Sequence, residues 1–176
     1  MLKEMKRNII NGLKQNTIGA GKCVKSLCDI IKEGGLPTYL QKQIRLDNIN
    51  KDGVILLFDD TVIAATMTIG GCATMLNIQG RKVPLVIIEE RFKGTDIEKA
   101  IYLHEIGHVK NDLPNKKDSK RVYSDELAAD MYAAKEMGAE KFINALKVIR
   151  EETFGYCTSE LDMRIAEITV NCGLDW

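Results

Sequence analysis

The sequence predicts an α+β protein with N-terminal helices, a small antiparallel sheet that includes an edge strand, and C-terminal helices that carry the functional site. Apolar residues recur at helical spacing towards both ends of the 176-residue chain. Short β-branched runs separated by turn residues fill the middle. Because 45% of the residues are hydrophobic, we expect one domain over 1–176, comprising a helical part (1–50), a sheet (54–90) and site-bearing helices (95–172).

The N-terminal part is predicted to contain two helices. Apolar residues recur at helical spacing within 2–15 and again within 24–31. Gly35 and Pro37 then end the second helix, because glycine disfavours helix and proline lacks an N–H. These helices are compatible with covering a cleft, forming an oligomer contact or completing the core.

The sheet is predicted to be an antiparallel meander of four strands, at 54–58, 61–69, 72–78 and 83–88. Pro84 cannot donate a hydrogen bond to a neighbouring strand, so we expect the last strand at the sheet edge. An edge strand offers backbone groups with which an extended substrate can pair. The same features also fit an ordinary edge protected by proline and nearby charges.

After Gly94 the chain is predicted to be helical. Thr95 and Glu98 form a capping box that opens a helix running to about Lys110. A loop around Pro114 leads to a second helix, which extends from near Ser124 to Gly138. Two further helices are expected around 142–149 and 158–168.

A metal-binding pattern lies on the first of these helices, in His104-Glu105-Ile106-Gly107-His108. Histidines four residues apart project from one helix face and can share one ion. Glu105 is offset from them by about 100°, where its carboxylate can act on a water that the ion activates. The alternative is a helix surface that carries two histidines and a glutamate without a metal. Since the chain has only two histidines, a third ligand must come from another residue type.

Carboxylates on the next helix are the candidates for that ligand. Glu126 and Asp130 are four residues apart and share a face. We expect Glu126 to complete the zinc site and Asp130 to accept a hydrogen bond from His104, which would fix the tautomer of that ring. Acidic residues in a first helical turn also interact favourably with the helix dipole without any metal.

Together, His104-Glu105-x-x-His108 and Glu126-x-x-Ala129-Asp130 resemble the gluzincin zinc metallopeptidases, most closely the branch of CAAX prenyl endopeptidases and heat-shock metalloproteases. The resemblance covers about 83–168 and implies a zincin-like fold. It implies Zn²⁺ bound by His104, His108 and Glu126, with Glu105 as general base. The small regulatory metallopeptidases of phages and mobile elements are a second resemblance.

A later helix of that branch carries an Arg-Ile pair, which Arg164-Ile165 resembles. The resemblance makes Arg164 the first candidate for stabilising the oxyanion of the transition state, ahead of Tyr156 and Tyr123. A structural salt bridge from Arg164 to a site carboxylate is an equal alternative. The branch often has His-Pro before this pair, whereas this chain has Thr158-Ser159 nearby.

The sequence therefore predicts a zinc-dependent endopeptidase acting on a protein or peptide. The alternatives are a zinc-containing regulatory or binding module with a single protein partner, and hydrolysis of a non-peptide amide. The net charge of zero and scattered basic residues argue against nucleic acid as a partner. The five cysteines do not have the spacing of a metal site or a disulfide framework. The sequence also has no signal-peptide pattern and no apolar run of about 20 residues. We therefore expect a soluble cytoplasmic protein without a membrane span.

Overall fold

The computed structural model describes residues 27–32, 34–66, 68, 70–111, 123–152 and 158–174. Within these ranges the protein is α+β, with seven α-helices and a three-stranded sheet. The elements follow in the order α2 (Leu27–Lys32), α3 (Thr38–Gln41), β1 (Ile55–Phe58), α4 (Asp60–Thr66), β2 (Gly71–Ile78), β3 (Arg81–Ile88), α5 (Asp96–Lys110), α6 (Tyr123–Met137), α7 (Ala139–Glu152) and α8 (Thr158–Asn171). Short 3₁₀ turns occupy Leu46–Asn48 and Glu90–Phe92.

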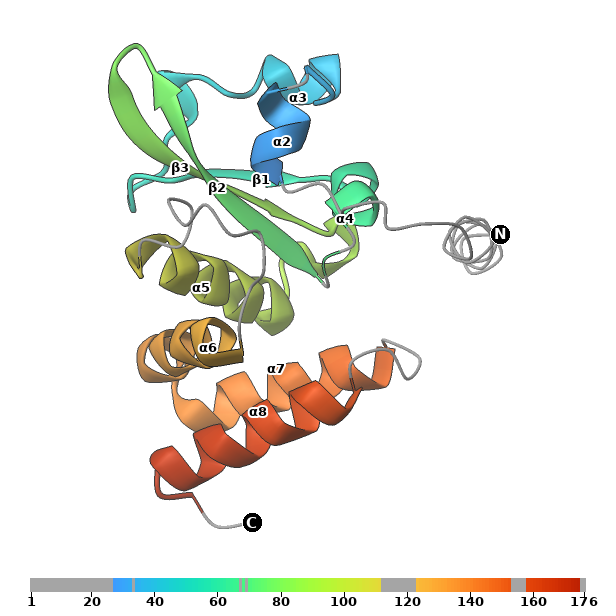
Figure 1. The fold of residues 1–176 in the computed structure, drawn as a ribbon, viewed down its shortest axis with the longest axis vertical. Coiled ribbons are helices and arrows are strands. Elements are labelled where there is room, and N and C mark those ends of the chain that lie inside the picture. Colours follow the sequence, from blue (N-terminus) through green and yellow to red (C-terminus); the bar gives the residue numbers. More distant parts are fainter. Residues whose placement is uncertain are drawn as a thin grey trace.

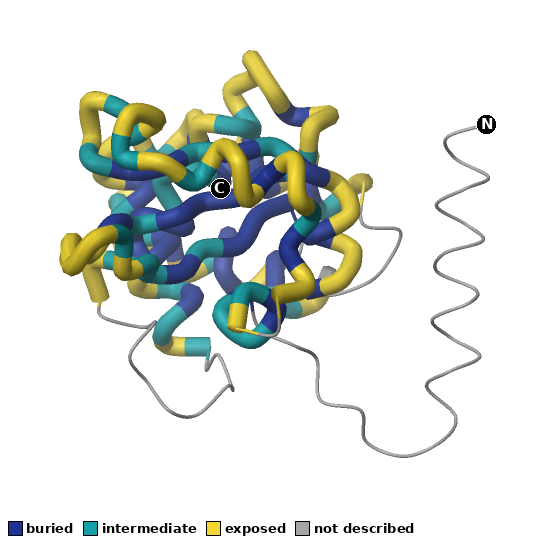
Figure 2. The backbone as a smooth tube through the Cα atoms, turned by 90° about the horizontal axis from the view of Figure 1, so that it is seen from above, coloured by how far each residue is buried: buried dark blue, intermediate teal, exposed yellow. Residues whose placement is uncertain are grey.

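Helices cover both faces of the sheet (Figure 1). Helices α2, α3 and α4 lie on one face, where they bury Leu85 and Ile87 of β3. Helix α5 lies against the other face, and α6, α7 and α8 follow it in a stack that packs with Val86 and Ile88. Figure 2 shows buried residues running through the middle of the molecule and exposed residues at its margins.

The strand predicted at the sheet edge is in fact the central strand. The strand order is β1-β3-β2, with β1 parallel and β2 antiparallel to β3, so the predicted antiparallel meander is wrong. Pro84 is accommodated because the backbone groups of a strand alternate in direction. The N–H of Glu89 points to Gly70 beside β2. Residues 84 and 89 are an odd number of positions apart, so the backbone nitrogen of Pro84 points the opposite way, towards β1. The ladder with β1 begins only at Leu85, so no hydrogen bond is lost.

The strand predicted at 61–69 is also wrong, because residues 60–66 form helix α4. Asp59 explains the difference, since its Oδ1 accepts the N–H of Val62 at 2.7 Å, as an N-cap does. Val62, Ile63 and Thr66 are then buried at helical spacing. The strand pattern was read from β-branched residues, which are tolerated in a short helix that packs on a sheet.

Strands β2 and β3 form a hairpin that turns at Gln79-Gly80. Both residues have positive φ, 53° at Gln79 and 80° at Gly80, as a two-residue type I′ turn requires. The register pairs Ile78 with Arg81 and continues to Gly71 opposite Ile88. The hairpin thereby places Gly71, the first residue of β2, beside the end of the central strand.

The N-terminal and C-terminal helix predictions have different outcomes. The helix expected over 2–15 lies outside the described residues, and the one expected over 24–31 is described from Leu27 as α2. The helices expected after Gly94 correspond to α5, α6, α7 and α8. In the described part of the chain, no helix has the length and apolar character needed to cross a membrane.

Candidate metal centre

Helix α5 carries His104, Glu105 and His108 and lies between the sheet and α6 (Figure 1). Its N-terminus is fixed by Thr95, whose Oγ1 accepts the N–H of Glu98 at 3.2 Å. The Glu98 carboxylate returns to the N–H of Gly94 rather than to that of Thr95. The structure therefore has the predicted cap from Thr95 to Glu98. The return bond from the Glu98 carboxylate goes to the residue before Thr95.

A glycine in the motif allows α5 to approach α6 closely. A β-carbon at Gly107 would lie 2.8 Å from Cα and 2.9 Å from the carbonyl oxygen of Ala129. These are backbone atoms, so a larger residue would have to push the helices apart. The close contact brings the histidines of α5 within reach of the carboxylates of α6. The sequence analysis did not identify Gly107 as a packing residue. A glycine inside the metal-binding pattern, between Glu105 and His108, was the one sign of a close helix contact.

Three side chains on the two helices converge on one point. His104 Nε2 lies 3.3 Å from Oε2 of Glu126, and His108 Nε2 lies 3.4 Å from Oε1 of the same carboxylate. The two Nε2 atoms are 2.9 Å apart. Each residue offers one ligand atom, and these atoms all lie within 4.8 Å of one another.

These separations fit a single zinc ion. Zinc binds nitrogen and oxygen ligands at about 2.0–2.2 Å in tetrahedral geometry, which places neighbouring ligand atoms about 3.3 Å apart. The distance between the two imidazole nitrogens is also informative, because two lone pairs facing each other at 2.9 Å repel unless a proton or a cation lies between them. The donor set of two imidazoles and one carboxylate is one that zinc accepts.

Asp130 orients the ring of His104. Its Oδ1 lies 2.7 Å from His104 Nδ1, and since a carboxylate only accepts, Nδ1 carries the proton and Nε2 faces His108 and Glu126. Burial alone would lower the pKa of His104, but the hydrogen bond to Asp130 and the neighbouring carboxylates raise it to about 9. In the absence of metal, this ring is therefore positively charged at neutral pH.

Arg164 reaches the cluster from α8. Its Nε and Nη2 donate to Oδ2 and Oδ1 of Asp130 at 2.5 and 2.7 Å, and its Nη1 lies 3.3 Å from Oε2 of Glu126. Burial alone would raise the pKa of Asp130, but its bonds to His104 and Arg164 keep that pKa below the ordinary value. The structure thus shows the salt bridge considered as the alternative role for Arg164, and its oxyanion role stays a prediction.

The two tyrosine candidates for oxyanion stabilisation differ in what the structure describes. Tyr123, at the start of α6, donates its hydroxyl hydrogen to Oε1 of Glu167 at 2.8 Å. This bond directs the hydroxyl towards α8. Tyr156 lies outside the described residues.

Glu105 is almost completely buried, with 2% of its surface exposed. Strand β2 lies next to it, because a β-carbon at Gly71 would come within 3.5 Å of Cγ of Glu105 and within 2.4 Å of Ile101. The absence of a side chain at Gly71 therefore lets the start of β2 contact α5 at the metal-binding motif. Gly71 lies between the strands predicted at 61–69 and 72–78, and the sequence gave no sign of this contact.

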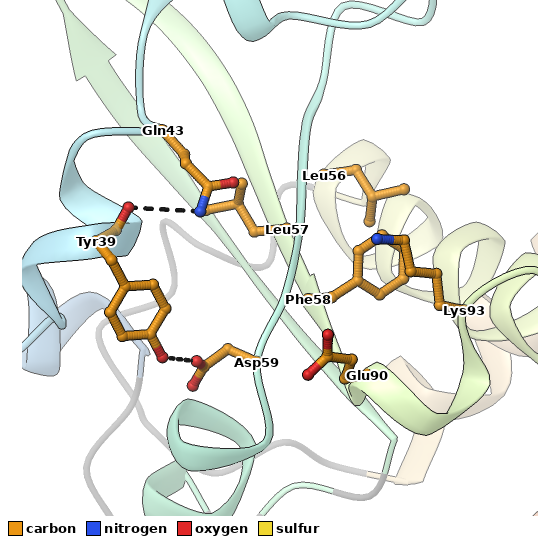
Figure 3. A pocket seen from close by; sticks show the side chains of 8 residues that line it. All are labelled: Tyr39, Gln43, Leu56, Leu57, Phe58, Asp59, Glu90 and Lys93. Atoms are coloured by element: carbon orange, nitrogen blue, oxygen red, sulfur yellow. Dashed lines mark hydrogen bonds between the residues drawn. The ribbon is translucent and has the colours of Figure 1, made fainter.

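A surface pocket lies elsewhere, along the outer edge of β1 (Figure 3). Its walls include Tyr39 on one side and Lys93 on the other, and the Tyr39 hydroxyl donates to Asp59. None of its eight lining residues belongs to the cluster of His104, His108 and Glu126. The pocket and the candidate metal centre are therefore separate features.

Comparison with protein-family models found no match to this chain, and comparisons with curated proteins and with solved structures found none either. The case for a function therefore depends on the geometry of the cluster.

Proposed function

We propose that this chain is a zinc-dependent endopeptidase of the gluzincin type, with His104, His108 and Glu126 as the zinc ligands. The observation that carries the proposal is the convergence of one ligand atom from each residue within 4.8 Å, with Glu105 next to His104 on helix α5. Three protein ligands favour catalysis, because catalytic zinc sites keep a fourth position for water whereas structural sites use four protein ligands.

In this proposal each residue has a defined task. Zinc held by His104, His108 and Glu126 would supply a water whose pKa is lowered to about 7 and a Lewis acid for the scissile carbonyl. Glu105 accepts the proton of that water and delivers it to the leaving amine. His104 is held by Asp130, so its Nε2 is already directed at the metal position.

The substrate we propose is an extended protein or peptide segment that pairs with β2. Strand β2 pairs only with β3 among the described residues, so it is an edge strand of the sheet there. It begins at Gly71, which contacts α5 beside Glu105. An extended segment added to this edge would use backbone hydrogen bonds for affinity. This assigns to β2 the role first predicted for residues 83–88, which form the centre of the sheet.

The test compares the wild type with Glu105→Gln on a mixed-sequence peptide library, with cleavage read by mass spectrometry. The variant keeps the side-chain volume and all proposed ligands but cannot accept a proton. We expect it to bind zinc as the wild type does and to lose at least about 100-fold in cleavage rate, the lower end of general-base contributions. A Glu105→Gln variant that cleaves the peptides at the wild-type rate would rule out Glu105 as the general base.

One observation favours a second candidate, a zinc-containing regulatory or binding module with a single protein partner. Glu105 and His108 are only 2% and 3% exposed, and low access to solvent is typical of zinc sites that stabilise a fold rather than turn over substrate. This candidate predicts that Glu105→Gln leaves partner binding intact and that the wild type cleaves no peptide in the library.

A further inference from the structure

We propose that Arg164 is a positioning residue of the metal centre, which fixes His104 through Asp130 and holds the carboxylate of Glu126. This inference rests on the proposed zinc site and gives Arg164 a task other than oxyanion stabilisation. It joins α8, which carries no proposed zinc ligand, to the two helices that carry them.

The Arg164–Asp130 pair has a bidentate geometry. Two nitrogens of the guanidinium bond the two carboxylate oxygens at 2.5 and 2.7 Å, so the carboxylate cannot rotate without losing a bond. Asp130 is fully buried. Its Oδ1 also accepts the N–H of His104 at 2.7 Å. The direction of the His104 ring is therefore set by a carboxylate that Arg164 holds.

The third nitrogen of the guanidinium faces the proposed ligand Glu126. Nη1 lies 3.3 Å from Oε2 of Glu126 and 3.8 Å from Oε1 of Glu160. Each nitrogen of Arg164 thus faces a protein carboxylate, and one of those carboxylates is the proposed third zinc ligand. Contact with Nη1 limits the positions that the Glu126 side chain can adopt.

Arg164 also brings a positive charge to the cluster. Glu126 and Asp130 both have buried side chains, and Arg164, 8% exposed, contacts both as a permanent cation. Its charge adds to that of the His104 ring in reducing the repulsion between these carboxylates. A lysine would supply the charge but not the planar fork that bonds both oxygens of Asp130.

The experiment measures zinc affinity, by competition with a chromophoric chelator, for the wild type, Arg164→Gln and Arg164→Lys. Substituting residues that orient zinc ligands commonly costs about 10–100-fold in metal affinity, and we expect a loss of that size for Arg164→Gln. Arg164→Lys should recover only part of it. Cobalt substituted for zinc should show a changed visible absorption spectrum in both variants, because its ligand geometry changes.

Arg150→Gln is the matched control. Arg150 on α7 also pairs with an aspartate of α8, with its Nε 2.5 Å from Oδ1 of Asp162, but these side chains are 40% and 50% exposed and neither belongs to the cluster of His104, His108 and Glu126. We expect its zinc affinity and cobalt spectrum to equal those of the wild type.

Zinc affinity and a cobalt spectrum unchanged in both Arg164 variants would overturn the inference. A loss of turnover at unchanged affinity would overturn it too, in favour of oxyanion stabilisation. If Arg164→Gln does not fold, Arg164→Lys decides between the same outcomes. A wild-type protein that binds no zinc would overturn the proposed function and this inference together, whereas equal zinc binding by wild type and variants would overturn the inference alone.

Discussion

His104 uses its two ring nitrogens differently. Nδ1 donates to Asp130 at 2.7 Å, and Nε2 faces the other two proposed ligands. The pattern H-E-x-x-H predicted that this residue is close to His108, because four residues make about one helical turn. The contact with Asp130 was predicted from the E-x-x-x-D spacing on the next helix. The hydrogen bonds of Arg164 depend on packing between residues 34 positions apart, so the sequence left its role open.

Zinc and a proton should compete for Nε2 of His104. The raised pKa, about 9 in the metal-free protein, means that zinc must displace a proton at neutral pH. We expect zinc affinity to increase by about tenfold per pH unit as the pH rises towards 9, measured against a chelator of known pH dependence. Asp130→Asn removes the charge that raises this pKa, and its pH dependence should shift to lower pH. Wild-type affinity that stays constant between pH 6.5 and 8.5 would contradict this explanation.

His104 also makes the stability of the metal-free protein depend on pH. Zinc affinity should rise with pH, whereas this stability should fall. The folded pKa of His104 lies above its ordinary value of 6.5, so the charged ring stabilises the fold. This contribution is complete below about pH 6.5 and is lost as the pH rises through about 9. Urea unfolding of the metal-free protein at several pH values should therefore show a smaller unfolding free energy at pH 9.5 than at pH 7. A Glu98→Gln variant, altered at an exposed helix end, should show the same pH trend.

At the scale of single elements, local signals predicted the helices better than the strands. Thr95 and the apolar spacing after it predicted α5, because capping and periodicity act between neighbours in sequence. The predicted position of β3 at the sheet edge was wrong, because β3 is the central strand. Strand order depends on contacts with partners far along the chain. The four consecutive buried residues of β3, Leu85 to Ile88, were the better guide, since a strand covered on both faces is apolar throughout.

Close packing of α5 on α6 can be tested at Gly107. We expect Gly107→Ala to push the helices apart, because the added carbon would lie 2.8 Å from a backbone atom of Ala129. Overpacking of this kind typically costs about 1–3 kcal/mol in unfolding free energy, and the displaced ligands should bind zinc more weakly. Ala128→Ser, which adds one atom on the exposed face of α6, is the control for both measurements. Wild-type zinc affinity in Gly107→Ala would show that the close approach does not position the site.

At the scale of the whole molecule, the candidate metal centre lies where the sheet-bound helix α5 meets the helices that follow it. Its three proposed ligands come from α5 and α6, and Arg164 adds α8. Composition predicted the α+β class, because helix-forming and strand-forming residues are segregated along the chain. The mixed sheet was not predicted, since parallel pairing of β1 with β3 requires the chain to cross over through α4 and β2.

Metal removal should destabilise the molecule, because zinc would bind the folded chain and join α5 to α6. At a free zinc concentration about 100 times the dissociation constant, binding adds about 2.7 kcal/mol, which corresponds to a rise in melting temperature of about 5–11 °C for a domain of this size. Differential scanning calorimetry after chelation and after zinc return should show this change reversibly. The His108→Ala variant should have the same melting temperature after chelation and after zinc return. A wild type whose melting temperature also stays the same would argue against a zinc site.

The central claim is that His104, His108 and Glu126 hold a zinc ion, and metal analysis of the purified protein tests it most directly. Inductively coupled plasma mass spectrometry, calibrated by amino-acid analysis, should find about one zinc per wild-type chain, the same in Glu105→Gln, and almost none in His108→Ala. A wild type without zinc after exposure to the metal, or equal zinc in wild type and His108→Ala, would contradict the claim.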